Sequence, residues 1–200
     1  MSRVGKTLIK IPSGVRVEFA DSIVTVTGSK GTLKQEVKNV IEVVITEGQV
    51  ELKRTNDDSQ TKAFHGLYNR LIANMVKGVS EGFVKTLILN GVGYKAAMKG
   101  ADLSLNVGYS HPCEVKAEEG VTFKILTPQE VSALNLGKDG ITLVIQVMGA
   151  NKERVGALAA KIRELRVVEP YHLYGIRYSD EFVVRKESKS GKAKGGAKKK

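Results

Sequence analysis

The chain has 200 residues, of which 42% are hydrophobic and 26% charged, and its net charge is +11. This globular composition allows one or two domains that bury their own cores. The single cysteine, Cys113, excludes an internal disulfide and a cysteine-rich zinc site, and it predicts a reducing compartment. No segment approaches the roughly 18 apolar residues that a membrane span needs, and we expect neither a signal peptide nor a membrane partner.

The first part of the sequence has the pattern of strands followed by a helix. Val15, Val17 and Phe19 alternate with polar residues, as in a half-buried strand, and turn residues predict hairpins over Ile23–Val37 and Val40–Lys53. The period then changes to that of an amphipathic helix, which should begin after a cap among Asn56, Asp57 and Asp58 and end before Gly82. Its apolar stripe is Phe64, Leu67, Tyr68, Leu71, Ile72, Met75, Val76 and Val79.

The same order of patterns then recurs. Strands are predicted over Phe83–Leu89, Leu103–Val107, Val121–Leu126 and Ile141–Met148. A second helix is predicted from about Lys152, with Asn151 as its N-cap, and Pro170 prevents much continuation. Its apolar face is Val155, Leu158, Ala159, Ile162 and Leu165.

This recurrence predicts an internal repeat. Gly28 matches Gly108, and the helix residues Lys62, Gly66 and Ile72 match Lys152, Gly156 and Ile162, with an insertion in the second copy at Thr127–Asp139. We therefore predict an α+β fold of two tandem similar domains, each an antiparallel sheet packed against a helix. The predicted boundaries are 1–82 for the first domain, 83–186 for the second and 187–200 for a disordered basic tail.

Catalytic motifs are missing from the sequence. The histidines, at positions 65, 111 and 172, are far apart; His65 is expected to flank the packed face of the first helix. There is no Cys-x-x-Cys pair and no phosphate-binding loop, and Asn90–Gly93 lacks the third glycine of a dinucleotide site. We predict that the protein is not an enzyme and has no cofactor, metal or small-molecule substrate. A small enzyme that uses His111 and Cys113 remains an alternative.

Several features favour RNA binding instead. Gly91 and Gly93 free the backbone to bend or to approach another backbone, and Tyr94 and Lys95 add an aromatic plane and a cation. The same residues also fit a glycine-rich turn with a core tyrosine.

The most basic part of the chain is its C-terminal third. The second helix carries Lys152, Arg154, Lys161, Arg163 and Arg166 against two glutamates, which could also be an ordinary solvated face. A segment without clear periodicity follows and interleaves aromatics with cations: Tyr171, His172, Tyr174, Arg177 and Tyr178. From Arg185 and Lys186 to the end there are eight basic residues and one acid. We place the main RNA-binding surface here, although a lysine tail can also serve solubility alone.

Four motifs identify a resemblance to the family of large-subunit ribosomal protein six, bacterial type. They are Asn90–Ala96, Gly108–Pro112 with Ser110 and His111, Asn151–Gly156, and Glu169–Tyr171 with Gly175–Tyr178. The opening Ser2–Lys6 and Ile9–Pro12 are also similar, so the resemblance covers the chain to about Lys186. One departure is His172-Leu173-Tyr174, where the family usually has lysines and a glycine; this puts the phosphate contacts of that segment in doubt.

The resemblance implies a structural protein of the cytoplasmic ribosome. It implies two tandem domains and binding to large-subunit ribosomal RNA, mainly through the second domain, near the sarcin–ricin loop. It further implies neighbouring ribosomal proteins at the stalk base, translation GTPases nearby, and a role in subunit assembly. A free-standing RNA-binding or RNA-chaperone protein is the alternative.

Overall fold

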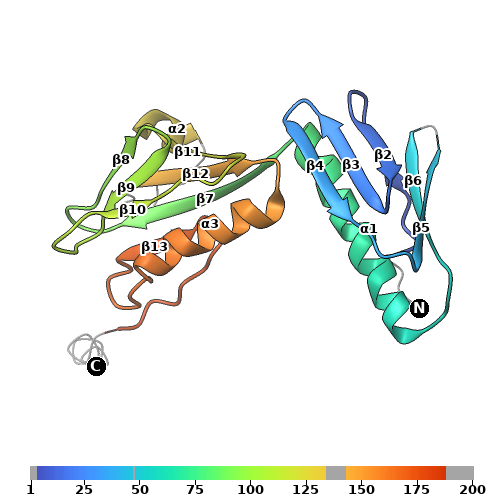
Figure 1. The fold of residues 1–200 in the computed structure, drawn as a ribbon. Coiled ribbons are helices and arrows are strands. Elements are labelled where there is room, and N and C mark those ends of the chain that lie inside the picture. Colours follow the sequence, from blue (N-terminus) through green and yellow to red (C-terminus); the bar gives the residue numbers. More distant parts are fainter. Residues whose placement is uncertain (1–3, 47, 134–142, 188–200) are drawn as a thin grey trace, which may run out of the picture. The chain divides into compact units, whose positions relative to one another are not determined.

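The computed structural model describes residues 4–46, 48–133 and 143–187, and the chain divides into two compact units (Figure 1). The first unit takes Met1–Phe83 with Met148–Val155, and the second takes Val84–Val147 with Gly156–Lys200. In both units strands precede a long helix, which is the predicted α+β architecture. Within the described residues, no helix is long and apolar enough to cross a membrane.

The first unit contains two small antiparallel sheets. One has the strand order β1-β6-β5 and the other β2-β3-β4. Both predicted hairpins are confirmed, since Gly28 pairs with Gly31 and Thr46 pairs with Gln49 at the two turns. The strand bounds are β1 Ile9–Lys10, β2 Arg16–Ala20, β3 Ile23–Gly28, β4 Gly31–Glu36, β5 Ile41–Thr46 and β6 Gln49–Arg54.

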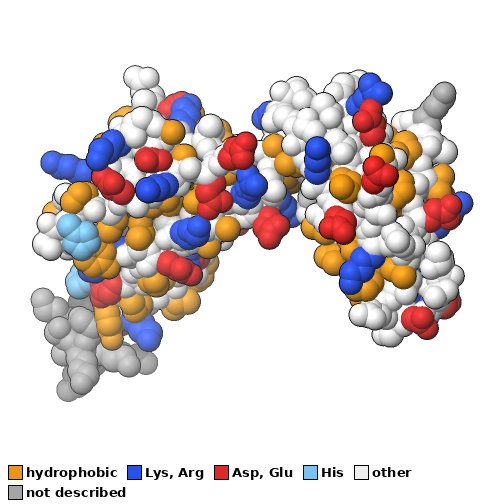
Figure 2. Space-filling model, in the orientation of Figure 1, with side chains coloured by type: hydrophobic (Ala, Val, Ile, Leu, Met, Phe, Trp, Pro, Cys, Tyr) orange, Lys and Arg blue, Asp and Glu red, His pale blue; other side chains and the backbone are white. Residues whose placement is uncertain are grey.

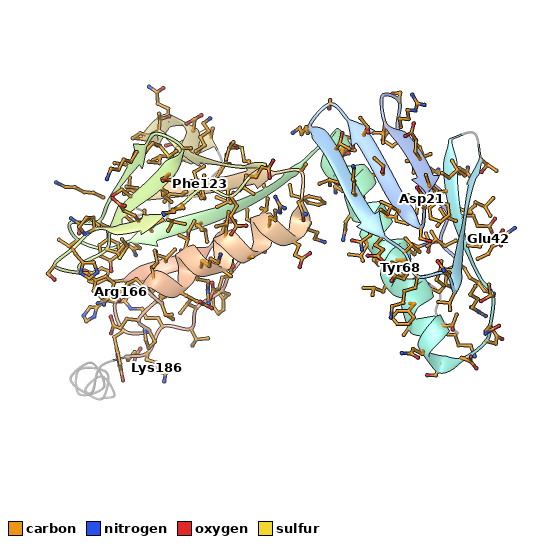
Figure 3. The ribbon with its side chains drawn as sticks, viewed as in Figure 1. Asp21, Glu42, Tyr68, Phe123, Arg166 and Lys186 are labelled. Carbon is orange, nitrogen blue, oxygen red and sulfur yellow. The ribbon has the colours of Figure 1, made fainter. Side chains whose placement is uncertain are left out.

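Helix α1, Ser59–Ser80, packs one face on these strands and ends before Gly82, as predicted. Tyr68, labelled in Figure 3, and Ile72 are central to this face. The predicted stripe is wrong at Leu67, which is 50% exposed, because the buried face is turned toward the polar residues Thr61, His65 and Asn69.

These buried polar side chains hold backbone that the sheets leave unpaired. The Asn69 amide donates hydrogen bonds to the carbonyl oxygens of Gly5, at 3.1 Å, and Thr7, at 2.9 Å. The Nε2 atom of His65 lies 3.0 Å from the carbonyl oxygen of Leu52. His65, expected to flank the packed face, therefore lies within it, because its ring satisfies a backbone acceptor of the neighbouring strand.

The second unit also has two sheets, a four-stranded one with the order β11-β12-β7-β13 and a three-stranded one with the order β10-β9-β8. A short helix, α2, occupies Pro128–Ala133 within the predicted insertion, whose remainder from position 134 lies outside the described residues. The strand bounds are β7 Phe83–Asn90, β8 Lys95–Lys99, β9 Asp102–Asn106, β10 Cys113–Val115, β11 Val121–Ile125, β12 Leu143–Gly149 and β13 Gly175–Tyr178.

Helix α3, Lys152–Leu165, confirms the second predicted helix. The side chain of Asn151 caps it by accepting a hydrogen bond from the backbone N–H of Glu153, at 2.9 Å. Its buried residues are those of the predicted apolar face, Val155, Leu158, Ala159 and Ile162, while Leu165 is half-buried.

The segment after α3 departs from the prediction. Gly175–Tyr178, predicted as irregular, forms strand β13 and pairs antiparallel with β7, from Gly175 opposite Asn90 to Tyr178 opposite Leu87. The strand conformation of this segment is fixed by its pairing with β7, which the local sequence pattern does not reveal. The predicted tail lies outside the described residues from position 188 onward.

Candidate nucleic-acid interface

Three loops of the second unit surround one open pocket of about 770 Å³. They are the turn between β7 and β8, the stretch after β9, and the end of α3 with the segment that follows. Arg166 and Lys186 lie at this end of the unit in Figure 3, and Figure 2 shows histidine side chains exposed among apolar ones there. The pocket is lined by Gly91, Val92, Tyr94, Gly108, Tyr109, Glu164, Leu165, Arg166, Val167, Glu169, His172 and Tyr174.

Gly91 makes room for the Tyr94 ring at the pocket, since a Cβ atom at position 91 would lie 2.6 Å from that ring. At Gly108 an added Cβ would be in ordinary contact with the ring, at 3.6 Å, and glycine is favoured there by the φ of 83°. Gly93 adopts a φ of 76°, which turns the chain back, and the following Lys95 is exposed at the start of β8. Tyr94 is only 8% exposed, so it forms a wall of the pocket rather than a free stacking plane.

Tyr109 forms a second wall. Its ring stacks on His111 with centroids 6.0 Å apart, and the guanidinium of Arg166 lies 5.3 Å from its centroid. Its hydroxyl donates a hydrogen bond to the carbonyl oxygen of Leu165, at 3.0 Å. Hydrogen bonding to the hydroxyls of Tyr109 and Tyr94 raises the pKa of Arg166 above its usual value. The cation and both tyrosines are therefore held together before any ligand binds. Ser110, between Tyr109 and His111, is exposed.

The loop after α3 forms the third wall. Glu169 donates its backbone N–H to the carbonyl oxygen of Tyr174, at 2.9 Å, and accepts one from Leu173, also at 2.9 Å. This closed loop places His172 and Tyr174 in a stack with centroids 5.6 Å apart. Asn90 of β7 fastens the loop through a hydrogen bond of 3.3 Å to the Leu173 carbonyl.

Glu169 organises the charge of this loop. One of its carboxylate oxygens lies 3.1 Å from Nδ1 of His172 and 3.3 Å from the backbone nitrogen of the same residue. Partial burial raises the pKa of Glu169, but the hydrogen bonds from His172 outweigh burial and lower the pKa overall. The Glu169 carboxylate is therefore held in its charged form.

Other predicted cations are engaged in contacts within the protein. Arg163 forms a two-pronged ion pair with Glu181, at 2.8 and 2.6 Å, and its guanidinium lies 5.8 Å from the centroid of the Tyr178 ring. Arg177 donates to the carbonyl oxygen of Glu181 at 3.4 Å. Arg163, Arg177 and Tyr178 thus anchor the C-terminal segment, and they do not line the pocket.

The C-terminal segment returns to the pocket loop. Arg185 donates to the carbonyl oxygen of Tyr171 at 3.2 Å, and the backbone N–H of Lys186 donates to that of Pro170 at 2.9 Å. Tyr171 is 46% exposed beside them. In contrast, Lys152 and Arg154 lie exposed on the first turn of α3, at the other end of the helix from Arg166.

Comparison with known proteins shows the family to which the chain belongs. The sequence model of the family described as Ribosomal protein L6 matches residues 11–82 and 90–179. The chain belongs to the ribosomal protein L6 family. Two relatives named "Large ribosomal subunit protein uL6" cover 96% of this chain over their full length: one from Clostridium acetobutylicum, 49% identical over 193 residues, and one from Staphylococcus epidermidis, 47% identical over 192 residues.

Membership of the ribosomal protein L6 family confirms the predicted resemblance. The match in two segments confirms the predicted tandem repeat, and the pocket lies within the second segment. The family consists of structural ribosomal proteins rather than enzymes. This bacterial-type chain is therefore a ribosomal protein of the cytoplasm. The enzyme alternative is therefore set aside; His111 stacks on Tyr109, and Cys113 is half-buried in β10.

Sequence reasoning missed part of the pocket. Tyr109 and Glu164 line it but were not among the predicted contacts. Tyr109 stands two residues before His111, and this closeness to a predicted contact was a usable signal. Glu164 gave no such signal, because an exposed glutamate on a basic helix looks like an ordinary solvated acid.

Proposed function

We propose that this chain is a constituent of the large ribosomal subunit and that its second unit binds ribosomal RNA there. In the finer form of the proposal, the binding site is near the sarcin–ricin loop at the stalk base. Neighbouring ribosomal proteins lie beside it, translation GTPases act nearby, and the contact supports subunit assembly. The names of the relatives support the coarse statement. The finer one rests on the family resemblance and on the surface of the second unit.

The observation that carries the proposal is the pairing of aromatic planes with cations around one pocket. Tyr109 and Tyr174 are each 41% exposed and are held by stacking partners. Little side-chain conformational entropy is therefore lost when RNA docks on them. Within the described residues, Lys95 and Lys186 have no acidic partner, and both flank the pocket loops. Structured RNA is recognised through stacking on unpaired bases and cation contacts to phosphates, which these two kinds of side chain supply.

The cations of α3 form a second contact region. Lys152 and Arg154 lie at the N-terminus of the helix, where the helix dipole also favours an anion. Phosphate neutralisation releases counterions, so six to ten such contacts would lose roughly 10³–10⁵-fold in affinity between about 50 and 200 mM salt, by analogy with duplex DNA. A salt titration without such a slope would contradict the proposal.

Charge reversal tests which surface matters. Lys152→Glu with Arg154→Glu should reduce incorporation into large subunits on sucrose gradients by about tenfold or more, because two attractive contacts become repulsive. The matched control is Arg70→Glu with Lys77→Glu on α1, which makes the same charge change on the other long helix and should be incorporated normally. We also expect the α3 double variant to be more severe than deletion of residues 190–200. Equal or reversed severity would refute this ranking.

The location is tested separately. Crosslinking of purified large subunits, followed by mapping of the modified nucleotides, should give sites near the sarcin–ricin loop. A free-standing RNA chaperone would instead wash off the subunits at moderate salt and crosslink to scattered RNA sites. Crosslinks confined to a distant part of the subunit would keep the coarse proposal and overturn the finer one.

A further inference from the structure

We propose that the pocket of the second unit holds a single unstacked RNA base, that this base is a guanine, and that the carboxylate of Glu164 reads its hydrogen-bonding edge. This inference rests on the proposed function and names the ligand group of that same surface. The pocket, of about 770 Å³, is in the size range of sites that enclose small ligand groups, roughly 300–1,000 Å³.

The walls suit a flat ring. Tyr109 and Tyr174 face the pocket from two different loops, and each is kept in place by a second ring, His111 or His172. The stacked pairs have interplanar angles of 18°. A base that leaves its helix can stack on such a preformed plane without ordering the side chain first.

The charges of the lining disfavour a phosphate. Two carboxylates, Glu164 and Glu169, line the pocket, and they would repel a phosphate group. The lining cation Arg166 is already engaged with the tyrosines Tyr94 and Tyr109. The phosphates of the bound nucleotide therefore belong outside the pocket, beside Lys95, Arg185 and Lys186.

The acceptors of the lining select among the bases. In the part of the chain that the structure describes, the Glu164 carboxylate forms no hydrogen bond, whereas Glu169 is engaged by His172. A free carboxylate offers two acceptor oxygens side by side. Guanine presents two adjacent donors, N1–H and the N2 amino group, on its pairing edge. Adenine, cytosine and uracil each present a single donor group there, so guanine makes the two-pronged, charge-assisted contact.

The experiment uses large subunits that carry the full-length chain. Kethoxal modifies N1 and N2 of unpaired guanines, and hydroxyl radicals report protection of the RNA backbone. In subunits with the unchanged protein, one guanine within the protein's backbone footprint should be protected from kethoxal. With Glu164→Gln its modification should increase at least about fivefold, because an amide can accept at only one of the two positions and presents a donor at the other.

The control and a second variant keep the test specific. Glu153→Gln removes the same charge from the same helix, outside the pocket, and should leave the modification unchanged. Tyr174→Leu removes one stacking plane and should also expose the guanine at least about fivefold. For each variant, kethoxal modification is measured together with the hydroxyl-radical footprint on the RNA backbone. The footprint shows whether the protein as a whole is still docked.

The possible outcomes separate the two proposals. If the footprint is present but no guanine responds to Glu164→Gln, the base pocket is wrong and RNA binding stands. If Glu164→Gln strengthens protection, the pocket holds a phosphate and the inference is overturned. If an adenine, cytosine or uracil responds instead to dimethyl sulfate or a carbodiimide, the guanine assignment is wrong. If the unchanged protein gives no footprint in the large subunit, the proposed function itself fails.

Discussion

The two units use the same architecture in opposite ways. In the first unit two polar side chains of the helix lie in its buried face: Asn69 and His65 are 2% and 3% exposed, and they bind backbone carbonyl oxygens. In the second unit the buried face of α3 is apolar, and the polar and aromatic side chains gather outside, at the loops beyond its end. The repeated fold therefore buries polar side chains of its helix in one unit, and in the other it places aromatic and charged side chains around the end of its helix.

The difference arises in short segments rather than in the helices and sheets. In the first unit the N-terminal segment, with Gly5 and Thr7, is tied to α1 by Asn69. In the second unit the chain after α3 adds strand β13 and closes the loop from Glu169 to Tyr174. Substitutions in these segments should therefore separate the stability of one unit from that of the other.

The largest effect is expected at Gly175, where the pocket loop enters β13. Its φ is 140°, and an added Cβ would lie 2.6 Å from the Cα atom of Val168 and 2.8 Å from the carbonyl oxygen of Val167. Because these neighbours are backbone atoms, Gly175→Ala should destabilise the second unit by about 3 kcal/mol or more. Urea unfolding followed by a probe in each unit measures this loss.

Gly156 provides the control for that substitution. It lies within α3, and a Cβ built there meets no heavy atom within 4 Å. Gly156→Ala should stabilise the unit by about 0.5–1 kcal/mol, because alanine loses less backbone entropy in a helix. A tolerated Gly175→Ala would mean that β13 does not fix the pocket loop.

The next effect concerns the first unit. Asn69→Ala removes two hydrogen bonds and leaves the carbonyl oxygens of Gly5 and Thr7 without this donor, so it should cost about 2 kcal/mol of unfolding free energy. Hydrogen exchange should accelerate around β1 and not in the second unit. Asn74→Ala is the control on the same helix, since in the described ranges the side chain of Asn74 forms no hydrogen bond. Equal costs for the two variants would contradict the role given to Asn69.

Periodic elements could be predicted from the sequence because their signal is local. Helix α3 has its apolar spacing and its cap, Asn151, within one continuous segment. Strand β13 could not be predicted, because its order depends on pairing with β7, which lies far earlier in the chain. The buried face of α1 was misplaced at Leu67 because His65 and Asn69 are polar residues whose partners are distant backbone carbonyls.

The sequence predicted the region of the candidate site but not the arrangement of its side chains. Its residue types, tyrosines with cations, are visible in the sequence, and the structure brings Tyr94, Arg166, His172 and Tyr174 to one pocket. The sequence did not reveal which of the basic side chains are free to contact RNA. Arg163 looks the same as Arg166 in the sequence, and only the fold brings Glu181 against it.

The smallest of the three effects concerns that ion pair, and it depends on pH. The two-pronged hydrogen bond from Arg163 lowers the pKa of Glu181 below its ordinary value of 4.5. A carboxyl group whose pKa is lowered by folding contributes stability at pH values above its unfolded pKa, and this contribution is lost as the pH falls through the folded value. Glu181→Gln should therefore cost about 1–2 kcal/mol at pH 7, because both groups are partly buried and in direct contact.

The pH dependence makes this prediction specific to the charge of Glu181. The difference between the unchanged chain and Glu181→Gln should be constant from about pH 6 to 8. It should shrink as the pH falls below 4.5 and through the lowered pKa of Glu181, where the carboxyl group of the unchanged chain also becomes neutral. Denaturant titrations of both proteins at pH 3.5, 5 and 7 measure it. A difference that does not change with pH would assign the stabilisation to the shape of the side chain. The anchoring of the C-terminal segment, unlike the RNA contact proposed for the pocket, would then owe nothing to charge.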